Sequence, residues 1–402
     1  MVHASIKSRF PLTAQVFLAA LLGVAFGALF DIPIWKELSQ FGKLLIHWVK
    51  VIAGPFLFFT IVSSILAADI SWKHGRRVLV VAMVNLSIAI LIGFSLARVF
   101  LMEKMEFISQ VDGGAKATPA AELSIAAWIK TISPSSIFEP FVKNDILLIA
   151  LLALIFGIAL RSSLKLDLQR LEKGVALFEF MREVMHKVLG WLIHLIPIAV
   201  FTLIAGAVSE HGLGILLVLS KYIAVVWLGF FLQCIFVYGA WIKFYARLDI
   251  RAFLRAAWPP LSHALGVNSS LATLPLTMKA LDSLGVSRRS SSIGAGLATN
   301  LNNDGIILYE AMAVFFIAEM HGISLGPMEM FTVALTCIVA ALGITGIPAA
   351  GFISLSVVIT TLGYPAEMLP LLLAVDWIVA RGRSAVNVMS DLTLSIAIDA
   401  KD

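Results

Sequence analysis

The sequence predicts an all-α membrane protein with eight transmembrane helices and two re-entrant helical hairpins. Of its 402 residues, 60% are hydrophobic and only 14% are charged, whereas soluble domains are nearer a quarter charged. Apolar segments long enough to cross a bilayer recur along the chain. Two apolar segments in the last third are interrupted by glycine, proline and polar residues, which predicts helices that enter the membrane and turn back.

Six apolar segments precede the interrupted region, at 11–30, 41–68, 78–101, 123–160, 174–207 and 213–242. We expect the first three and the last two to be plain spanning helices. The fourth contains a Ser-Pro pair and a Lys-Asn-Asp run, so we expect it to be in pieces. The first apolar segment is long enough to span, so we expect no cleavable signal.

Lysine and arginine set the expected orientation. Basic loops lie at 73–77, 161–173, 243–255 and 279–289, and the intervening loops hold few cations. The positive-inside rule places the basic loops in the cytoplasm. We therefore expect a protein integral to the lipid bilayer of a bacterial-type inner membrane, with both termini cytoplasmic.

The two hairpins follow from this orientation. Residues 256–278 are apolar, yet both flanking loops are predicted to be cytoplasmic, so we expect a re-entrant hairpin with 268–270 at its tip. A helix at 290–318 then runs outward, and residues 328–362 form a second hairpin around GITGIPAAG. A final helix at 366–397 runs inward. Two hairpin–helix units of opposite orientation form an inverted repeat, which is typical of secondary transporters.

The final helix carries a polar stripe. Its members are spaced i, i+4, i+7, i+11 and i+15 and share one helix face: Asp376, Ala380, Arg383, Asn387 and Asp391. Arg383 offers a fork of donors that matches a carboxylate, while Asn387 and Asp391 offer the hard oxygen ligands that sodium takes. Charges at bilayer depth are costly, so the stripe predicts a binding site. The alternative is that its charged groups reach to water near the cytoplasmic end.

Other polar groups fall at the same predicted depth. The run 302–305 (NNDG) should unwind the outward helix and free carbonyls for a cation, or else form a polar packing patch. Glu310 lies two turns further on, and it is either a structural residue held by a partner such as Arg381 or a proton carrier. Ser269 and Ser270 adjoin the start of a helical arm, where backbone N–H groups attract carboxylates.

Several function classes are not supported. The net charge of +5 comes from the loops that set orientation, so it does not indicate nucleic-acid binding. No GxxxxGK[ST] motif occurs, which leaves ATP-driven transport unsupported. We expect no enzymatic activity and no cofactor, with sodium acting as a coupling ion.

Together these residues resemble the dicarboxylate/amino acid:cation symporter family, the family of the glutamate transporters. The resemblance covers essentially the whole chain. It is carried by SSLATLP (269–275), NNDGI (302–306), LYEA (308–311), the glycines and proline of 343–351, and the stripe of 376–391.

The resemblance implies an elevator-type homotrimer. The implied scaffold comprises 11–68 (helices 1 and 2) and 123–207 (helices 4 and 5). The implied transport domain comprises 78–101 (helix 3) and 213–399 (helix 6, hairpin one, helix 7, hairpin two and helix 8). The residues implied for substrate binding are Ser269, Ser270, Ile306, Ile347, Gly351, Asp376, Ala380, Arg383, Ser384 and Asn387. Those implied for sodium are Asn302, Asp304, Asn387 and Asp391, and Glu310 is our candidate proton carrier.

Departures from the family pattern indicate the substrate. Ala380 stands where amino acid carriers place an aspartate that receives the substrate's ammonium group, and Ile306 replaces a threonine that touches substrate. The family's sodium site in helix three, normally lined by Tyr, Thr and Ser, would map to Ala82, Asn85 and Leu86, so most of its oxygen ligands are missing here. We therefore expect a symporter of a small carboxylate, preferably a C4-dicarboxylate, coupled to sodium, protons or both. The alternatives are a sodium-coupled symporter of acidic or neutral amino acids, and an anion channel or transport-inactive member.

Overall fold

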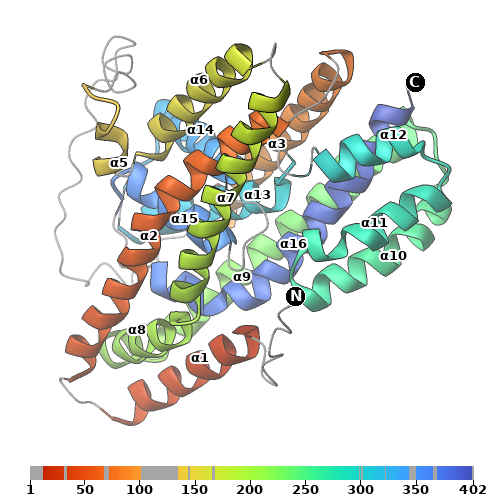
Figure 1. Ribbon diagram of the computed structural model, residues 1–402. Helices are drawn as coiled ribbons and strands as arrows, with labels where there is room; N and C mark the ends of the chain where they lie inside the picture. Colours follow the sequence, from red (N-terminus) through yellow and green to blue (C-terminus); the bar gives the residue numbers. More distant parts are fainter. Residues whose placement is uncertain are drawn as a thin grey trace, which may run out of the picture.

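The computed structural model describes residues 12–30, 34–67, 72–100, 135–143, 145–164, 168–297, 299, 302–321, 323–343, 350–364 and 369–400. All regular structure in these residues is helical (Figure 1), which confirms the all-α prediction. Two helical stretches are each long and apolar enough to cross a membrane, Gly75–Phe100 and Leu216–Tyr245, and a bent pair provides a third. The expected total of eight spanning helices stays a prediction.

The first three helices lie where the apolar segments predicted them. They are α1 (Leu12–Leu29), α2 (Ile34–Ala67) and α3 (Trp72–Phe100). Helix α1 packs along α8 (Ile196–His211), as Figure 1 shows, and the two backbones come close at Gly27, where a side chain would collide with the backbone of Ala205.

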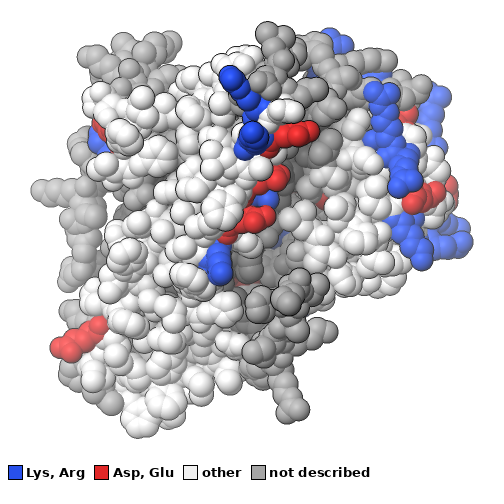
Figure 2. Space-filling view, viewed as in Figure 1, with Lys and Arg blue, Asp and Glu red and all other residues white. Residues whose placement is uncertain are grey.

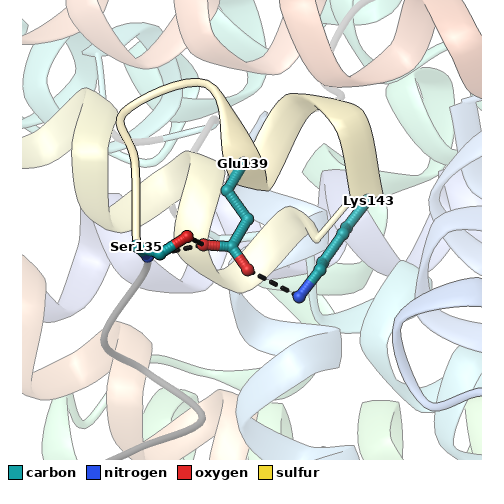
Figure 3. Close-up of polar contacts among 3 residues, drawn as sticks. All are labelled: Ser135, Glu139 and Lys143. Carbon is teal, nitrogen blue, oxygen red and sulfur yellow. Dashed lines mark hydrogen bonds and ion pairs between the residues drawn. The ribbon is translucent and has the colours of Figure 1, made fainter.

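The fourth segment is in pieces, as predicted, with α5 (Glu139–Lys143) preceding α6 (Ile146–Leu164). Residues 123–134 lie outside the described part of the chain. Glu139 fixes the start of α5, because its carboxylate accepts hydrogen bonds from the backbone and hydroxyl of Ser135 and pairs with Lys143 (Figure 3). These bonds, the one from Lys143 foremost, lower the pKa of Glu139 to about 2.

The prediction of one plain helix at 174–207 is wrong. Helix α7 (Leu168–Ile193) ends before α8 begins, and the chain bends by 44° between them. Pro197 lies in the first turn of α8, where its missing N–H costs nothing. The residue before a proline is disfavoured in a continuing helix, so the same proline favours a break there.

The next span is longer than predicted and leads into hairpin one. Helix α9 (Gly214–Leu232) continues through two π-helical turns, η1 (Gln233–Tyr238) and η2 (Trp241–Tyr245). Hairpin one consists of α10 (Ile250–Val267) and α11 (Ser270–Ser283).

The tip of hairpin one is where the sequence placed it. Asn268 ends α10 in the left-handed conformation, with φ of 55°, which asparagine tolerates better than most residues. Ser269 then caps α11 by accepting a hydrogen bond from the backbone N–H of Ala272.

The predicted outward helix is interrupted at the NNDG run, as expected. It consists of α12 (Arg288–Ser291) and η3 (Ser292–Leu297), then a break that includes Asn302 and Asn303, and then α13 (Asp304–Met320). The arms of hairpin two are α14 (Pro327–Gly343) and α15 (Ala350–Thr361), and the last helix is α16 (Leu369–Asp399). The tip of hairpin two, 344–349, lies outside the described residues.

The two hairpins have different neighbours. Hairpin one packs on α16 and η3, at the edge of the molecule in Figure 1. Hairpin two packs on α13 and also reaches α2 and α6. Helices α13 and α16 cross at the centre between the hairpins, and residues 304–318 of α13 are all buried.

Candidate substrate and cation site

The charged stripe of α16 is buried. Arg383 is only 5% exposed and Asp376 only 6%, so the alternative in which they reach to water is wrong. Arg383 donates a hydrogen bond through Nη1 to Asp376 Oδ1 at 2.9 Å. The remaining guanidinium N–H groups of Arg383 form the part of its fork that a carboxylate could bind.

Two neighbours fix the position of the Arg383 guanidinium. Its carbon lies 4.8 Å from the ring centroid of Tyr309 on α13, which is within cation–π distance. On another side lies Gly351 at the start of α15, where an added side chain would overlap the guanidinium. Hairpin two therefore lies directly against Arg383, and a side chain at position 351 would require the guanidinium to shift.

Hairpin one is tied to the same helix. Ser384 donates a hydrogen bond to Asn268 Oδ1 at 2.9 Å. Arg381 points away from the stripe, and its Nη1 donates to the carbonyls of Leu265 and Gly266 at 2.8 and 3.1 Å. These carbonyls end α10, where a cation is favoured. The hypothesis that Arg381 holds Glu310 is therefore wrong, because Arg381 binds the hairpin.

The serines of hairpin one have different roles. The Ser269 hydroxyl oxygen caps α11 by accepting the N–H of Ala272, which leaves its O–H able to donate to a ligand. Ser270 begins α11, where backbone N–H groups favour an anion. Both serines are half-buried.

A cluster of buried oxygen atoms lies where α13 begins. Asn302 is fully buried, and neither its amide oxygen nor its nitrogen has a hydrogen-bond partner among the described residues. Asp391 accepts a hydrogen bond from Thr299 on Oδ2 at 2.9 Å, while its Oδ1 has none. Asn302 is close enough to Asp391 to act on it electrostatically. Unsatisfied buried oxygens of this kind need a water or an ion.

Asn387 connects this cluster to the break in the helix. Its Oδ1 accepts the backbone N–H of Gly305 at 2.9 Å, and its Nδ2 donates to Asn303 at 3.3 Å. A side chain at Gly305 would collide with the backbone of Arg383 and with Asn387. Glycine is therefore needed for α13 to start this close to α16.

Asp304 lies in a separate pocket with hydrogen-bond donors around it. Its Oδ2 accepts from Tyr238 at 2.7 Å and from Ser390, and the amide of Gln233 is also a neighbour. Gln233 donates to the backbone carbonyl of Asn85. Protein donors thus occupy Oδ2 of Asp304, whereas its Oδ1 has no hydrogen-bond partner among the described residues.

Of the predicted helix-three residues, Asn85 lies against this pocket, where its backbone carbonyl accepts from Gln233. Ala82, Asn85 and Leu86 are all buried. Asn85 Oδ1 accepts a hydrogen bond from the indole of Trp241 at 2.7 Å, so this oxygen is already engaged. Sequence reasoning missed Tyr238 and Gln233, although a glutamine within an apolar run is a signal that could have pointed to Gln233.

Glu310 is fully buried on α13. Neither carboxylate oxygen accepts a hydrogen bond of ordinary geometry from the described residues, although Ser354 and Cys337 of hairpin two are close enough to act on it. Arg383 acts on it at longer range. Glu310 therefore faces hairpin two, with the substrate-site arginine further away.

The remaining predicted substrate residues are Ile306 and Ala380, both buried, and Ile347, which lies outside the described residues. Within the described part of the chain, no group of three His, Cys, Asp or Glu side chains is arranged to hold a metal ion. The ligands available near Asp391 are instead amide, hydroxyl and single carboxylate oxygens. Such a set suits a monovalent hard cation such as sodium better than a transition metal.

Comparison with known proteins agrees with this geometry. The profile of the sodium:dicarboxylate symporter family matches residues 12–401. The chain is 27% identical, over 98% of its length and 93% of the relative, to the proton/glutamate-aspartate symporter of Escherichia coli (strain K12). It is also 27% identical to the C4-dicarboxylate transport protein of Bacillus subtilis (strain 168), over 96% of this chain and 92% of that one.

A third relative is the proton/sodium-glutamate symport protein of Bacillus subtilis (strain 168). The two sequences are 25% identical over 98% of this chain and 93% of the relative's length. The chain therefore belongs to the sodium:dicarboxylate symporter family. Because identity is nearly the same to amino acid and dicarboxylate carriers, the substrate must be inferred from the site.

Proposed function

We propose that this protein is a secondary active symporter that couples movement of a small dicarboxylate without an amino group to a sodium gradient, a proton gradient or both. Family membership supports a dicarboxylate or amino acid symporter. One observation favours the dicarboxylate. The buried stripe that presents Arg383 carries Ala380 in place of a second carboxylate, and Asp376 is already paired with Arg383.

The energetic argument rests on desolvation. A substrate carboxylate can pair with Arg383 and with the N-terminus of α11. A substrate ammonium group would need an acceptor of its own, and burying it unpaired costs several kcal/mol. Succinate, fumarate and malate have carboxylates that can form these pairs, and they have no ammonium group to bury.

The cluster around Asp391 supports sodium coupling. Asn302, Asn387, Asp391 and the carbonyls freed by the helix break could supply the several oxygens that a sodium ion requires. The Asp304 pocket supports a sodium ion less well, because Tyr238 and Ser390 donate to Oδ2 of that carboxylate and leave only Oδ1 without a partner among the described residues.

Glu310 supports proton coupling. A buried carboxylate without hydrogen bonds is costly while it is charged, and binding a proton would neutralise it. Glu310→Gln mimics the protonated form, so this variant should bind and exchange substrate but lose accumulation driven by a pH gradient. Accumulation with unchanged pH dependence would show that Glu310 carries no proton.

The packing supports the division into a scaffold and a moving domain. Helices α1, α2, α6, α7 and α8 pack on one another, while α3, α9, α13, α16 and hairpin one form a second group. In the elevator mechanism of the proposed homotrimer, the second group moves with hairpins one and two across the first.

The decisive experiment is uptake into proteoliposomes with sodium and proton gradients imposed separately. When a panel of carboxylates with and without amino groups is tested, the dicarboxylates without amino groups should accumulate. Their accumulation should stop when the gradient is dissipated. Flux that ignores both gradients would favour an anion channel, and no flux would favour a member that has lost transport.

A further inference from the structure

The outer face of α10 presents cations to the surroundings. Arg251 and Arg255, one turn apart, are exposed on its first two turns, and Lys243 and Arg247 are exposed on the segment that leads into it. Figure 2 shows lysine and arginine gathered on the side of the molecule where Figure 1 places α10, α11 and α12.

The same face is also apolar. Leu254 is 51% exposed and Trp258 is 67% exposed, and Ile250 precedes them at the same helical spacing. At 100° per residue, Trp258 projects between Arg251 and Leu254, so cations and apolar groups share one continuous face. Just before α10, Phe244 is 74% exposed with the Lys243 ammonium 5.6 Å from its ring centroid.

These residues are ordered by depth. The positive-inside rule places the start of α10 at the cytoplasmic surface. The arginines occupy its first two turns and Trp258 follows one turn later, about 10 Å along the axis from Arg251. Arginines followed by a tryptophan one turn deeper is the order that crosses from lipid headgroups toward hydrocarbon, and Leu254 lies between the two arginines.

We propose that this face of α10, defined by Arg251, Leu254, Arg255 and Trp258, binds the headgroups of anionic phospholipids in the cytoplasmic leaflet. The two guanidinium groups pair with the lipid phosphates, and Leu254 and Trp258 lie against the upper part of the acyl chains. Charge complementarity selects the anionic lipid, because the apolar groups alone do not distinguish it from a zwitterionic one.

Trp258 supplies the readout. Brominated acyl chains quench tryptophan at short range, and the Trp258→Phe variant isolates the signal of this residue from the other tryptophans. The full chain in detergent is titrated with brominated phosphatidylglycerol or brominated phosphatidylcholine. We expect phosphatidylglycerol to quench Trp258 at a concentration about 25-fold lower than phosphatidylcholine does, about fivefold for each of the two arginines.

In the double variant Arg251→Gln/Arg255→Gln, both brominated lipids should quench Trp258 equally. The matched control Arg288→Gln/Arg289→Gln, on α12, should keep the preference for phosphatidylglycerol. High salt should remove the preference in the wild-type protein, which tests the proposal even if the double variant does not fold. Equal quenching in the wild type, or a preference that survives the double substitution, would overturn it.

Discussion

Gly351→Ala tests whether hairpin two lies directly on the substrate-site arginine. A methyl group at this position would overlap the guanidinium of Arg383. Arg383 cannot move aside freely, because Asp376 holds its Nη1 at 2.9 Å and Tyr309 packs 4.8 Å from its carbon. Overpacking of this kind costs about 1–3 kcal/mol. If the cost falls on the closed, substrate-bound state, affinity should weaken roughly 5- to 150-fold.

The assay is titration calorimetry of the purified protein with succinate at saturating sodium. Gly190→Ala is the matched control, because a methyl group there meets no atom within 4 Å. The control should bind as the wild type does, and both variants should elute as the wild type does on gel filtration. Wild-type affinity in Gly351→Ala would refute the close approach of hairpin two to Arg383.

Three further substitutions test other parts of the site. Arg383→Lys keeps the charge but loses the planar fork, so dicarboxylate affinity should fall at least about tenfold, or about 1.4 kcal/mol; unchanged affinity would remove Arg383 from the site. Asp391→Asn should raise the sodium concentration needed for half-maximal binding more than it weakens substrate binding at saturating sodium, and the reverse order would contradict the sodium assignment. Tyr238→Phe removes a hydrogen bond to Asp304 and should lower unfolding stability by about 1.5–3 kcal/mol in denaturant titrations. The control is Tyr222→Phe, because the hydroxyl of Tyr222 has no partner among the described residues. Equal losses of stability in the two variants would count against the Asp304 pocket.

Much of the fold followed from local sequence. The tip of hairpin one was predictable because basic loops on both sides of an apolar segment exclude a single span. The break before α13 was predictable because three polar residues and a glycine cannot continue a helix at bilayer depth without a partner. The bend between α7 and α8 was missed, since Pro197 is compatible with either a helix start or a kink.

The site was predicted where its residues share one helix. The stripe from Asp376 to Asp391 needed only the helical repeat. The contacts of Thr299 with Asp391 and of Tyr238 with Asp304 join residues 92 and 66 positions apart, and local pattern contains no information on such pairs. Arg381 was considered as a partner for Glu310, but it projects from α16 on a different face from Arg383 and binds the end of α10 instead.

The central claim is that a gradient drives accumulation of a dicarboxylate and that Ala380 excludes amino acids. Its most direct test is uptake of labelled succinate and aspartate into proteoliposomes under an inward sodium gradient, in the wild type and in Ala380→Asp. The wild type should accumulate succinate over aspartate and lose the accumulation when the gradient is dissipated, and Ala380→Asp should shift the preference toward aspartate. Preferential accumulation of aspartate by the wild type, or the same preference in both proteins, would contradict the account.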